Sequence, residues 1–148
     1  MKLDKDEYVI VEVIPTKAKD GDIVELTALR INGLKLIDRF NYRLNKSKVE
    51  IPEFLEMCSY DDDKFEYCDN TKDIVDSFKK WVGDLPLVVI DNTYTSNYLD
   101  FSNKLELVFP HLELEVDGEV IQNMINKYKL EESNYIVDLV YEAIIRHF

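Results

Sequence analysis

The first 44 residues alternate apolar segments with short polar turns. Residues 8–14 read Tyr-Val-Ile-Val-Glu-Val-Ile and are β-branched or apolar on both faces, which is typical of a buried central strand. The turn sequence Asp20-Gly21-Asp22 precedes a second predicted strand over 23–31. Asn32-Gly33 is then a strong signal for a two-residue hairpin into a third strand over 34–44. The pattern therefore predicts an antiparallel meander of three strands.

Helical spacing of apolar positions dominates the rest of the chain. After a loop-rich segment over 45–70, Asn70 and Thr71 are good helix caps and Gly83 is a stop signal, so we expect a helix over 71–82. The short apolar run at 85–90 predicts a buried fourth strand. Further helices are expected over 93–104, 120–128 and 136–145, and the weak alternation at 112–116 marks a fifth, edge strand.

The order of these elements predicts the architecture. Three antiparallel strands followed by a strand that returns through a helix crossover predict a mixed five-stranded sheet with helices on its faces. The strand over 8–14 should be central. This is the layout of the RNase H-like α/β fold, and the length of 148 residues fits a single domain over 1–148.

Composition narrows the expected partners. The chain carries 30 acidic and 18 basic residues, a net charge of −12, and Lys79-Lys80 is the only adjacent basic pair. Because nucleic-acid affinity depends on local positive charge, we expect weak or absent binding to DNA and RNA. There is no membrane-length apolar run and no signal peptide, so we expect a cytosolic protein with Cys58 and Cys68 as free thiols.

Several stretches resemble one family. Residues 8–16 look like the first strand of the DEDD 3′–5′ exonucleases, the group that includes polymerase proofreading domains. Residues 21–28 resemble the second strand of that family, 31–40 its hairpin into the third, and Ile51-Pro52 its loop prolines. The segment over 74–99 matches the following helix, the fourth strand and the start of the next helix. The resemblance covers most of the chain up to about residue 104, is weaker over 105–130, and implies an RNase H-like fold.

The resemblance also implies a chemistry. Enzymes of this family hydrolyse phosphodiesters with two divalent ions, Mg²⁺ or Mn²⁺, which clamp the attacking water and the leaving oxygen. Four carboxylates hold these ions. The first two come from the first strand as an acid-x-acid pair that points to one sheet face, the third from the helix after strand four, and the fourth from the last helix beside a His or Tyr base.

Carried over position by position, the resemblance implies a depleted site. The first acid corresponds to Glu12 and the fourth to Asp138, so both keep a carboxylate. The second corresponds to Ile14 and the third to Thr95, neither of which supplies a negative charge. The general base corresponds to Ser133 in the His-type pattern, and Tyr135 is the nearest equivalent in the Tyr-type pattern.

The residues also have ordinary structural interpretations. Glu12 can be a carboxylate near the exposed end of a strand, Thr95 a first-turn helix residue, and Asp138 a solvated helix position. Asp91, four residues before Thr95, is the one acid that could compensate for a lost ligand. The candidate metal ligands are therefore Glu12, Asp91 and Asp138, and no catalytic residue or cofactor is expected.

Three functions remain open. The first is a catalytically silent exonuclease-like module that binds another macromolecule, most simply a protein. The second is a degenerate 3′–5′ exonuclease on DNA or RNA that uses Glu12, Asp91 and Asp138 around Mg²⁺ or Mn²⁺. The third is an acidic nucleic-acid mimic that inhibits a nucleic-acid enzyme, as small phage inhibitors of host defence do. Oligomeric state and the identity of the partner are not encoded in any motif.

Overall fold

The structure is a computed structural model that describes residues 7–17, 19–57, 60–89, 95, 97–99, 105–108, 126, 129 and 136–147. Its strands are β1 (Glu7–Pro15), β2 (Ile23–Asn32), β3 (Lys35–Leu44), β4 (Glu66–Cys68), β5 (Leu87–Val89) and β6 (Leu105–Val108). Its helices are the 3₁₀ turn η1 (Lys46–Lys48), α1 (Glu53–Met57), α2 (Thr71–Val82) and α5 (Ile136–His147).

The described strands form one mixed sheet in the order β4-β3-β2-β1-β5-β6. The pairs β1–β2 and β2–β3 are antiparallel, whereas β5 is parallel to β1 and is reached through α2. The strand β1 is therefore central, and its long apolar run is explained by neighbours on both sides. The predicted mixed α/β sheet, the antiparallel meander and the helix crossover are confirmed.

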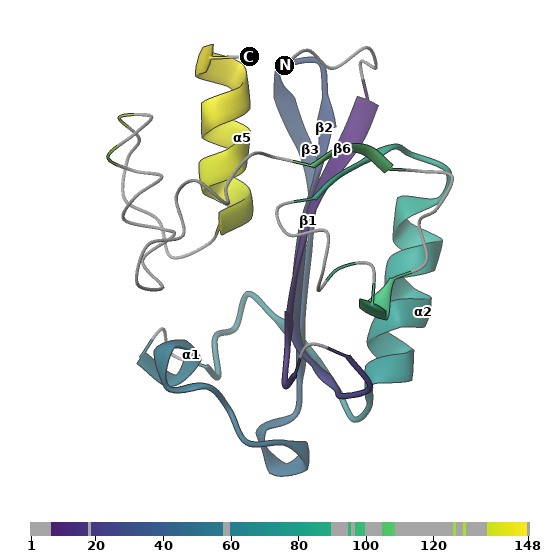
Figure 1. Cartoon of the computed structure of the whole chain (residues 1–148), viewed down its shortest axis with the longest axis vertical. Helices are drawn as coiled ribbons and strands as arrows, with labels where there is room; N and C mark the ends of the chain where they lie inside the picture. The colour runs from purple at the N-terminus through teal and green to yellow at the C-terminus, as the bar shows by residue number, and fades with distance from the viewer. Residues whose placement is uncertain are drawn as a thin grey trace.

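Two helices cover the two faces of this sheet, α2 on one side and α5 on the other (Figure 1). The helix α2 begins after Asn70, whose side chain accepts a hydrogen bond from the Asp73 backbone N–H at 2.9 Å, and it ends at Gly83. The bounds and both caps of this helix follow the sequence prediction. It buries Ile74 and Phe78 against the sheet. The predicted last helix corresponds to α5.

The hairpin between β2 and β3 differs from the prediction by one position. Asn32 still pairs with Lys35, so the two loop residues are Gly33 and Leu34, not Asn32 and Gly33. Gly33 has φ of 64° and Leu34 has no positive φ. A turn that needs a positive φ only at its first central position is of the II′ type, and one glycine at that position satisfies it.

Other differences lie in the short elements. The segment predicted as a loop over 45–70 contains η1, α1 and β4, all too short to give a periodic signal. The strand β4 adds a sixth strand beside β3, and β6 occupies the opposite edge at 105–108. The predicted strand over 112–116 lies outside the described residues, as do nearly all of the predicted helix over 120–128 and most of the one over 93–104, although Thr95, Asn97 and Tyr98 are helical. Cys68 is a free thiol on β4, and Cys58 lies outside the described residues. None of the described helices is long and apolar enough to cross a membrane.

Candidate functional site

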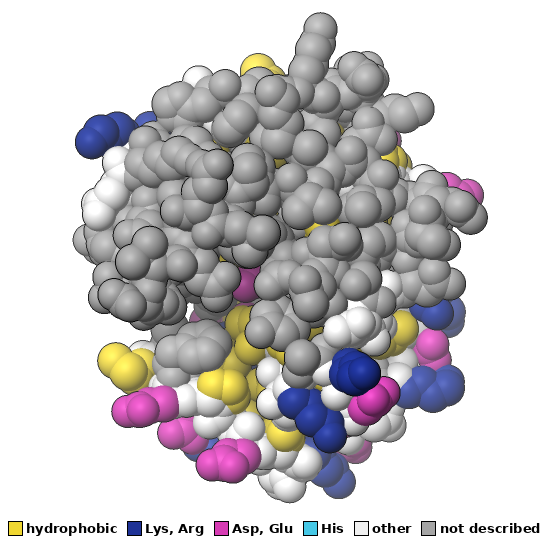
Figure 2. All heavy atoms as spheres, in the orientation of Figure 1, with side chains coloured by type: hydrophobic (Ala, Val, Ile, Leu, Met, Phe, Trp, Pro, Cys, Tyr) yellow, Lys and Arg dark blue, Asp and Glu magenta, His cyan; other side chains and the backbone are white. Residues whose placement is uncertain are grey.

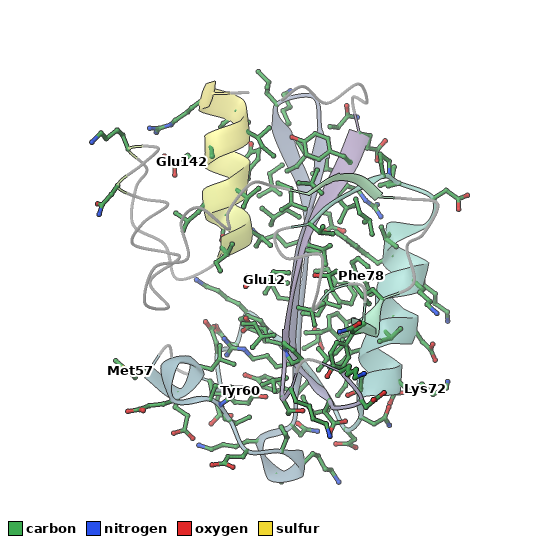
Figure 3. All side chains as sticks on the ribbon, in the orientation of Figure 1. Glu12, Met57, Tyr60, Lys72, Phe78 and Glu142 are labelled. Atoms are coloured by element: carbon green, nitrogen blue, oxygen red, sulfur yellow. The ribbon has the colours of Figure 1, made fainter. Side chains whose placement is uncertain are left out.

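The relic positions are Glu12, Ile14, Thr95 and Asp138, which correspond to the four carboxylates of the family pattern. Alternation along β1 places the first two of them on the face that α5 covers. Ile10 packs against Val137 and Val140 of α5. Because side chains two residues apart share a face, Glu12 and Ile14 also point to the α5 side. Glu12 is half-buried and lies opposite Thr27 of β2, and Figure 3 shows it on the α5 side while Phe78 lies between the sheet and α2.

Asp138 lies in the first turn of α5, and its carboxylate is bound by an arginine. The Arg39 Nη2 of β3 donates to Asp138 Oδ1 at 2.6 Å. The two side chains are 44% and 21% exposed, so this ion pair sits at the rim of the face, not in its core. Asp138 therefore shares a sheet face with Glu12, and a guanidinium occupies the carboxylate oxygen that would otherwise be offered to a cation.

Ile14 belongs to an apolar cluster. It packs against the buried side chains of Ile51, Leu55 and Tyr60, which fix the segment containing α1 to the sheet. At this position the family pattern has its second acid. Here the same position contributes to packing, so a carboxylate would have to be desolvated in the cluster to remain in place.

Thr95 is buried, with 2% of its surface exposed, and its backbone carbonyl accepts a hydrogen bond from Leu99 N–H at 2.8 Å. Its burial and its place in a helical segment fit the structural interpretation of this residue. Asp91, Ser133 and Tyr135, the remaining candidates, lie outside the described residues.

The loop after β1 is tied to the segment that contains Thr95. The Tyr98 hydroxyl accepts a hydrogen bond from Gly21 N–H at 3.1 Å and donates one to the Lys17 carbonyl at 2.5 Å. A Cβ added at Gly21 would lie 2.4 Å from Thr16 Oγ1, 2.7 Å from Lys17 Cγ and 3.0 Å from the Tyr98 hydroxyl. The tight approach of these segments therefore requires glycine at position 21.

A buried ion pair next to Ile14 was not predicted. Glu25 of β2 lies opposite Ile14 on one side and Arg43 of β3 on the other, and Arg43 Nε donates to Glu25 Oε1 at 2.7 Å. Arg43 has no exposed surface, donates to the Tyr60 carbonyl, and lies with its guanidinium carbon 3.6 Å from the centre of the Phe65 ring. Burial raises the pKa of Glu25, and the charge and hydrogen bond of Arg43 act against that rise.

A signal for this pair exists in the sequence. Glu25 interrupts the apolar run Ile-Val-Glu-Leu-Thr-Ala-Leu of the second strand, and Arg43 stands at the matching end of the third. An ionised residue on the inward face of a strand requires a partner, since an unpaired buried charge is very unfavourable. Pairing the two strands through the hairpin register would have brought these residues together.

The described residues do not fit a two-metal centre. They contain no group of three or more His, Cys, Asp or Glu side chains that could hold a metal ion. The same sheet face carries the guanidinium groups of Arg39 and Arg43, and each is already bound to a carboxylate. Each of these guanidinium groups therefore neutralises one carboxylate of the face, Asp138 or Glu25, and the Glu12 carboxylate lies on the same face.

Comparisons with known proteins give a distant similarity to two bacterial DNA polymerases. The chain is 26% identical over 104 residues to the PolC-type DNA polymerase III of Bacillus subtilis and 24% identical over 104 residues to that of Bacillus cereus. In each case the match covers 69% of this chain and only 7% of the polymerase. No protein-family model matches the chain. The similarity to these polymerases agrees coarsely with an exonuclease-like domain.

Proposed function

We propose that this chain is a catalytically silent exonuclease-like module that acts by binding another protein. The observation that carries the proposal is the state of the relic positions. The Asp138 carboxylate is bound by Arg39 at 2.6 Å, and Ile14 is part of an apolar cluster. Distant similarity to the PolC-type polymerases supports an exonuclease-like origin for the fold.

The electrostatic argument concerns the charge of two divalent ions. They would bring four positive charges to a site in which Ile14 and Thr95 replace two of the four expected carboxylates. A cation near Asp138 would also have to displace Arg39, whose charge is fixed because guanidinium does not lose its proton. Loss of outer ligands alone commonly reduces metal affinity or activity by about 10–100-fold, so the loss of direct ligands should abolish activity.

Surface charge supports a protein partner over a nucleic acid. The chain has a net charge of −12. On the face drawn in Figure 2, the Lys and Arg side chains of the described residues are interspersed with Asp and Glu side chains and do not gather into a basic patch. Binding to a polyanion relies on such a patch.

A degenerate nuclease is the second candidate. It is favoured by one observation, that Glu12 and Asp138 keep their carboxylates and lie on the same sheet face. One metal held by these two residues and Asp91 would be its basis.

One assay separates the two functions. End-labelled single-stranded DNA and RNA are incubated with the wild-type chain and with the double variant Glu12→Ala, Asp138→Ala, in Mg²⁺ and in Mn²⁺. We expect no trimming by either protein, and no saturable Mn²⁺ binding by calorimetry. Metal-dependent trimming by the wild type that is absent from the double variant would refute the silent module and establish the nuclease.

A further inference from the structure

The outer edge of β3 is only partly covered. The short strand β4 pairs with Tyr42, Arg43 and Leu44. No described strand pairs with the outer side of β3 between Lys35 and Asn41, and Ile37 in this stretch is 54% exposed. An uncovered edge offers a row of backbone donors and acceptors to another extended chain.

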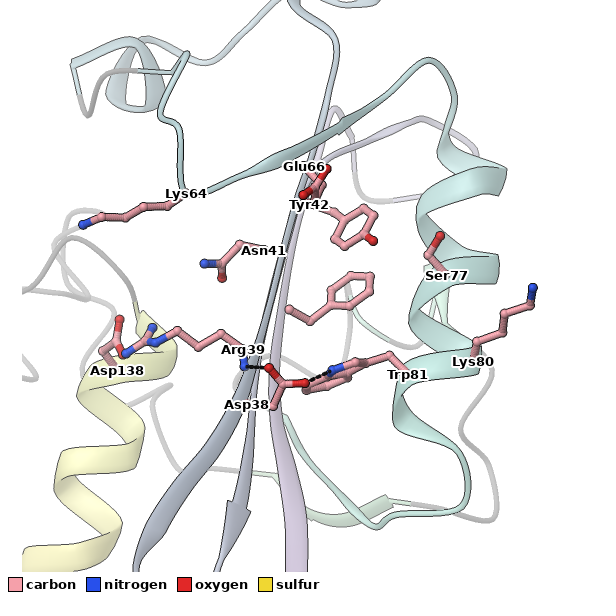
Figure 4. A pocket seen from close by; sticks show the side chains of 11 residues that line it. Asp38, Arg39, Asn41, Tyr42, Lys64, Glu66, Ser77, Lys80, Trp81 and Asp138 are labelled. Atoms are coloured by element: carbon pink, nitrogen blue, oxygen red, sulfur yellow. Dashed lines mark hydrogen bonds and ion pairs between the residues drawn. The ribbon is translucent and has the colours of Figure 1, made fainter.

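A groove of about 1090 Å³ lies along this edge. Its wall on the α2 side includes Phe40, Tyr42 and Trp81, and its wall on the α5 side includes Arg39, Lys64 and Asp138. Figure 4 shows the two walls on opposite sides of β3, with α2 beyond the aromatic wall. Because the groove is lined from both faces of β3, the backbone of β3 forms its floor. An exposed sheet edge is a common place for an extended peptide to add as a strand.

The backbone of β3 shows where a neighbouring strand would bind. Asn45 N–H donates to the Cys68 carbonyl at 2.8 Å, so this set of alternate residues faces outward. Arg39 N–H, in the same set, donates to the Asp38 carboxylate at 2.8 Å, and Trp81 Nε1 donates to the other oxygen of that carboxylate at 2.9 Å. Asp38 thus takes the position of a carbonyl from a missing strand, and alternation places the backbone of Asn41 on the same open side.

The side chains along the groove define the occupant. Phe40 and Tyr42 stack with ring centres 4.0 Å apart and present an apolar wall. Lys64 on the other wall forms no ion pair with any described residue. Because side chains of an added strand alternate between the two walls, one set should be apolar and the other acidic.

Two other occupants fit less well. A second copy of this chain would pair β3 antiparallel with itself, and any such register centred on Ile37, Asp38 or Arg39 places like charges opposite one another, which is unfavourable. A nucleic acid would place a continuous row of phosphates against a lining that contains Asp38, Glu66 and Asp138 as well as Arg39, Lys64 and Lys80, whereas a peptide strand can direct its acidic side chains to the Lys64 wall alone.

We propose that this groove binds an extended peptide segment of a partner protein, which adds to the sheet as a strand beside β3 in line with β4. The proposal rests on the proposed function, because it supplies the surface through which a silent module acts. The apolar side chains of the peptide pack against Phe40, Tyr42 and Trp81, and its acidic side chains face Lys64. The peptide accepts a hydrogen bond from Asn41 N–H and displaces the Asp38 carboxylate from Arg39 N–H.

The test uses the acetylated and amidated peptide Val-Glu-Phe-Glu-Val-Glu as the probe. Trp81 is the only tryptophan and lines the groove, so its emission reports binding at this place. Two further peptides keep the same side chains but carry N-methyl groups on one or the other set of alternate residues. Only one set of N–H groups faces β3 in an added strand, so one methylated peptide should bind like the parent and the other at least about tenfold more weakly.

Two controls locate the contact. The variant Lys64→Glu should bind the parent peptide about fivefold more weakly than the wild type does. A peptide with Lys in place of Glu should bind to this variant more tightly than the parent peptide does. Circular dichroism should confirm that the variant is folded. A twelve-nucleotide oligothymidylate should neither change Trp81 emission nor displace the peptide.

Three results would overturn the proposal. They are unchanged Trp81 emission at millimolar peptide, equal binding of the two methylated peptides, or displacement of the peptide by oligothymidylate. None of them bears on the nuclease assay, and trimming activity would refute the silent module without altering the peptide result, so the two failures are distinguishable.

Discussion

The two faces of the sheet are stabilised in different ways. On the α2 face, Val9, Val11 and Val13 of β1 meet Ile74 and Phe78 in an apolar core. On the α5 face the apolar core under α5 is followed by rows that contain Glu12, Thr27, Glu25 and Arg43, next to the separate apolar cluster that includes Ile14. Charged side chains occur on both faces, since Arg30 lies over the Trp81 ring on the α2 side, but the buried carboxylate–guanidinium pair Glu25–Arg43 lies on the face of Glu12 and Ile14.

The difference between the two faces indicates which residues of such a fold can be replaced while the architecture is kept. The α2 face and the central strand preserve the architecture, because any polar substitution there would be buried without a partner. On the α5 face a carboxylate pocket can be replaced by other charge pairs, such as Glu25–Arg43 and Asp138–Arg39, and the helices keep their places. Loss of a metal site and retention of a fold are compatible for this reason.

The largest effect on the free energy of unfolding should come from the buried Glu25–Arg43 pair. Arg43→Met leaves the Glu25 carboxylate buried without its guanidinium and should lower the free energy of unfolding by about 3–5 kcal/mol in urea titrations. The double variant Arg43→Met, Glu25→Leu should regain most of this loss, because no charge is left unpaired. Ile74→Val on the α2 face should cost about 0.5–1.5 kcal/mol. If the double variant is as unstable as Arg43→Met, the pair is not what distinguishes the two faces.

A second effect on the free energy of unfolding should appear at alkaline pH, and the two tyrosines that cause it also lie on the α5 side of the sheet. Burial raises the pKa of Tyr8 and of Tyr60 to about 12, with nearby Tyr141 adding to the rise at Tyr8. The unfolded chain loses these phenolic protons near pH 10 and the folded chain retains them, so the free energy of unfolding should fall as pH rises from 10 to about 12. Urea titrations of Tyr8→Phe and Tyr60→Phe should give a shallower fall. An unchanged pH profile in both variants would exclude these two tyrosines as its source.

The smallest effect on the free energy of unfolding should come from the partly exposed Arg39–Asp138 ion pair. Arg39→Gln removes an ion pair whose members are 44% and 21% exposed, so the free energy of unfolding should change by about 0–1 kcal/mol. Lys72→Gln, which removes a fully exposed pair with Asp76 on α2, is the matched control and should change the free energy of unfolding less than Arg39→Gln does. A loss well above that range for Arg39→Gln would mean that this pair holds α5 in place and is not a replaceable surface contact.

Much of the architecture could be predicted because its signals are local. The helix over 71–82 carries both of its caps in the sequence, and β1 shows its central position by being apolar on both faces. The hairpin was found through Gly33, although its loop was displaced by one residue. The strand β4 was missed because three residues give no periodicity, and it exists only because Tyr42, Arg43 and Leu44 offer an edge.

The site was less accessible to prediction for a physical reason. The identities of Glu12, Ile14, Thr95 and Asp138 could be assigned by resemblance, and the common face of Glu12 and Ile14 follows from the alternation of β1. That Asp138 is bound by Arg39 depends on a contact across 99 positions of the chain, which no local pattern encodes. The expectation that the Glu12 and Asp138 carboxylates lie about 4–8 Å apart, as ligands around magnesium-type ions would, stays a prediction, as do the roles of Asp91 and Ser133.

The link between Gly21 and Tyr98 has a consequence for variation among related sequences. The tyrosine hydroxyl binds both Gly21 N–H and the Lys17 carbonyl, and there is no room for a Cβ at position 21. A relative with a larger residue at that position must rearrange the side chains at positions 16 and 17, which a Cβ would approach most closely, as well as the hydroxyl at position 98. Positions 16, 17, 21 and 98 should therefore change together, and comparing relatives at these positions would reveal whether they preserve the same loop.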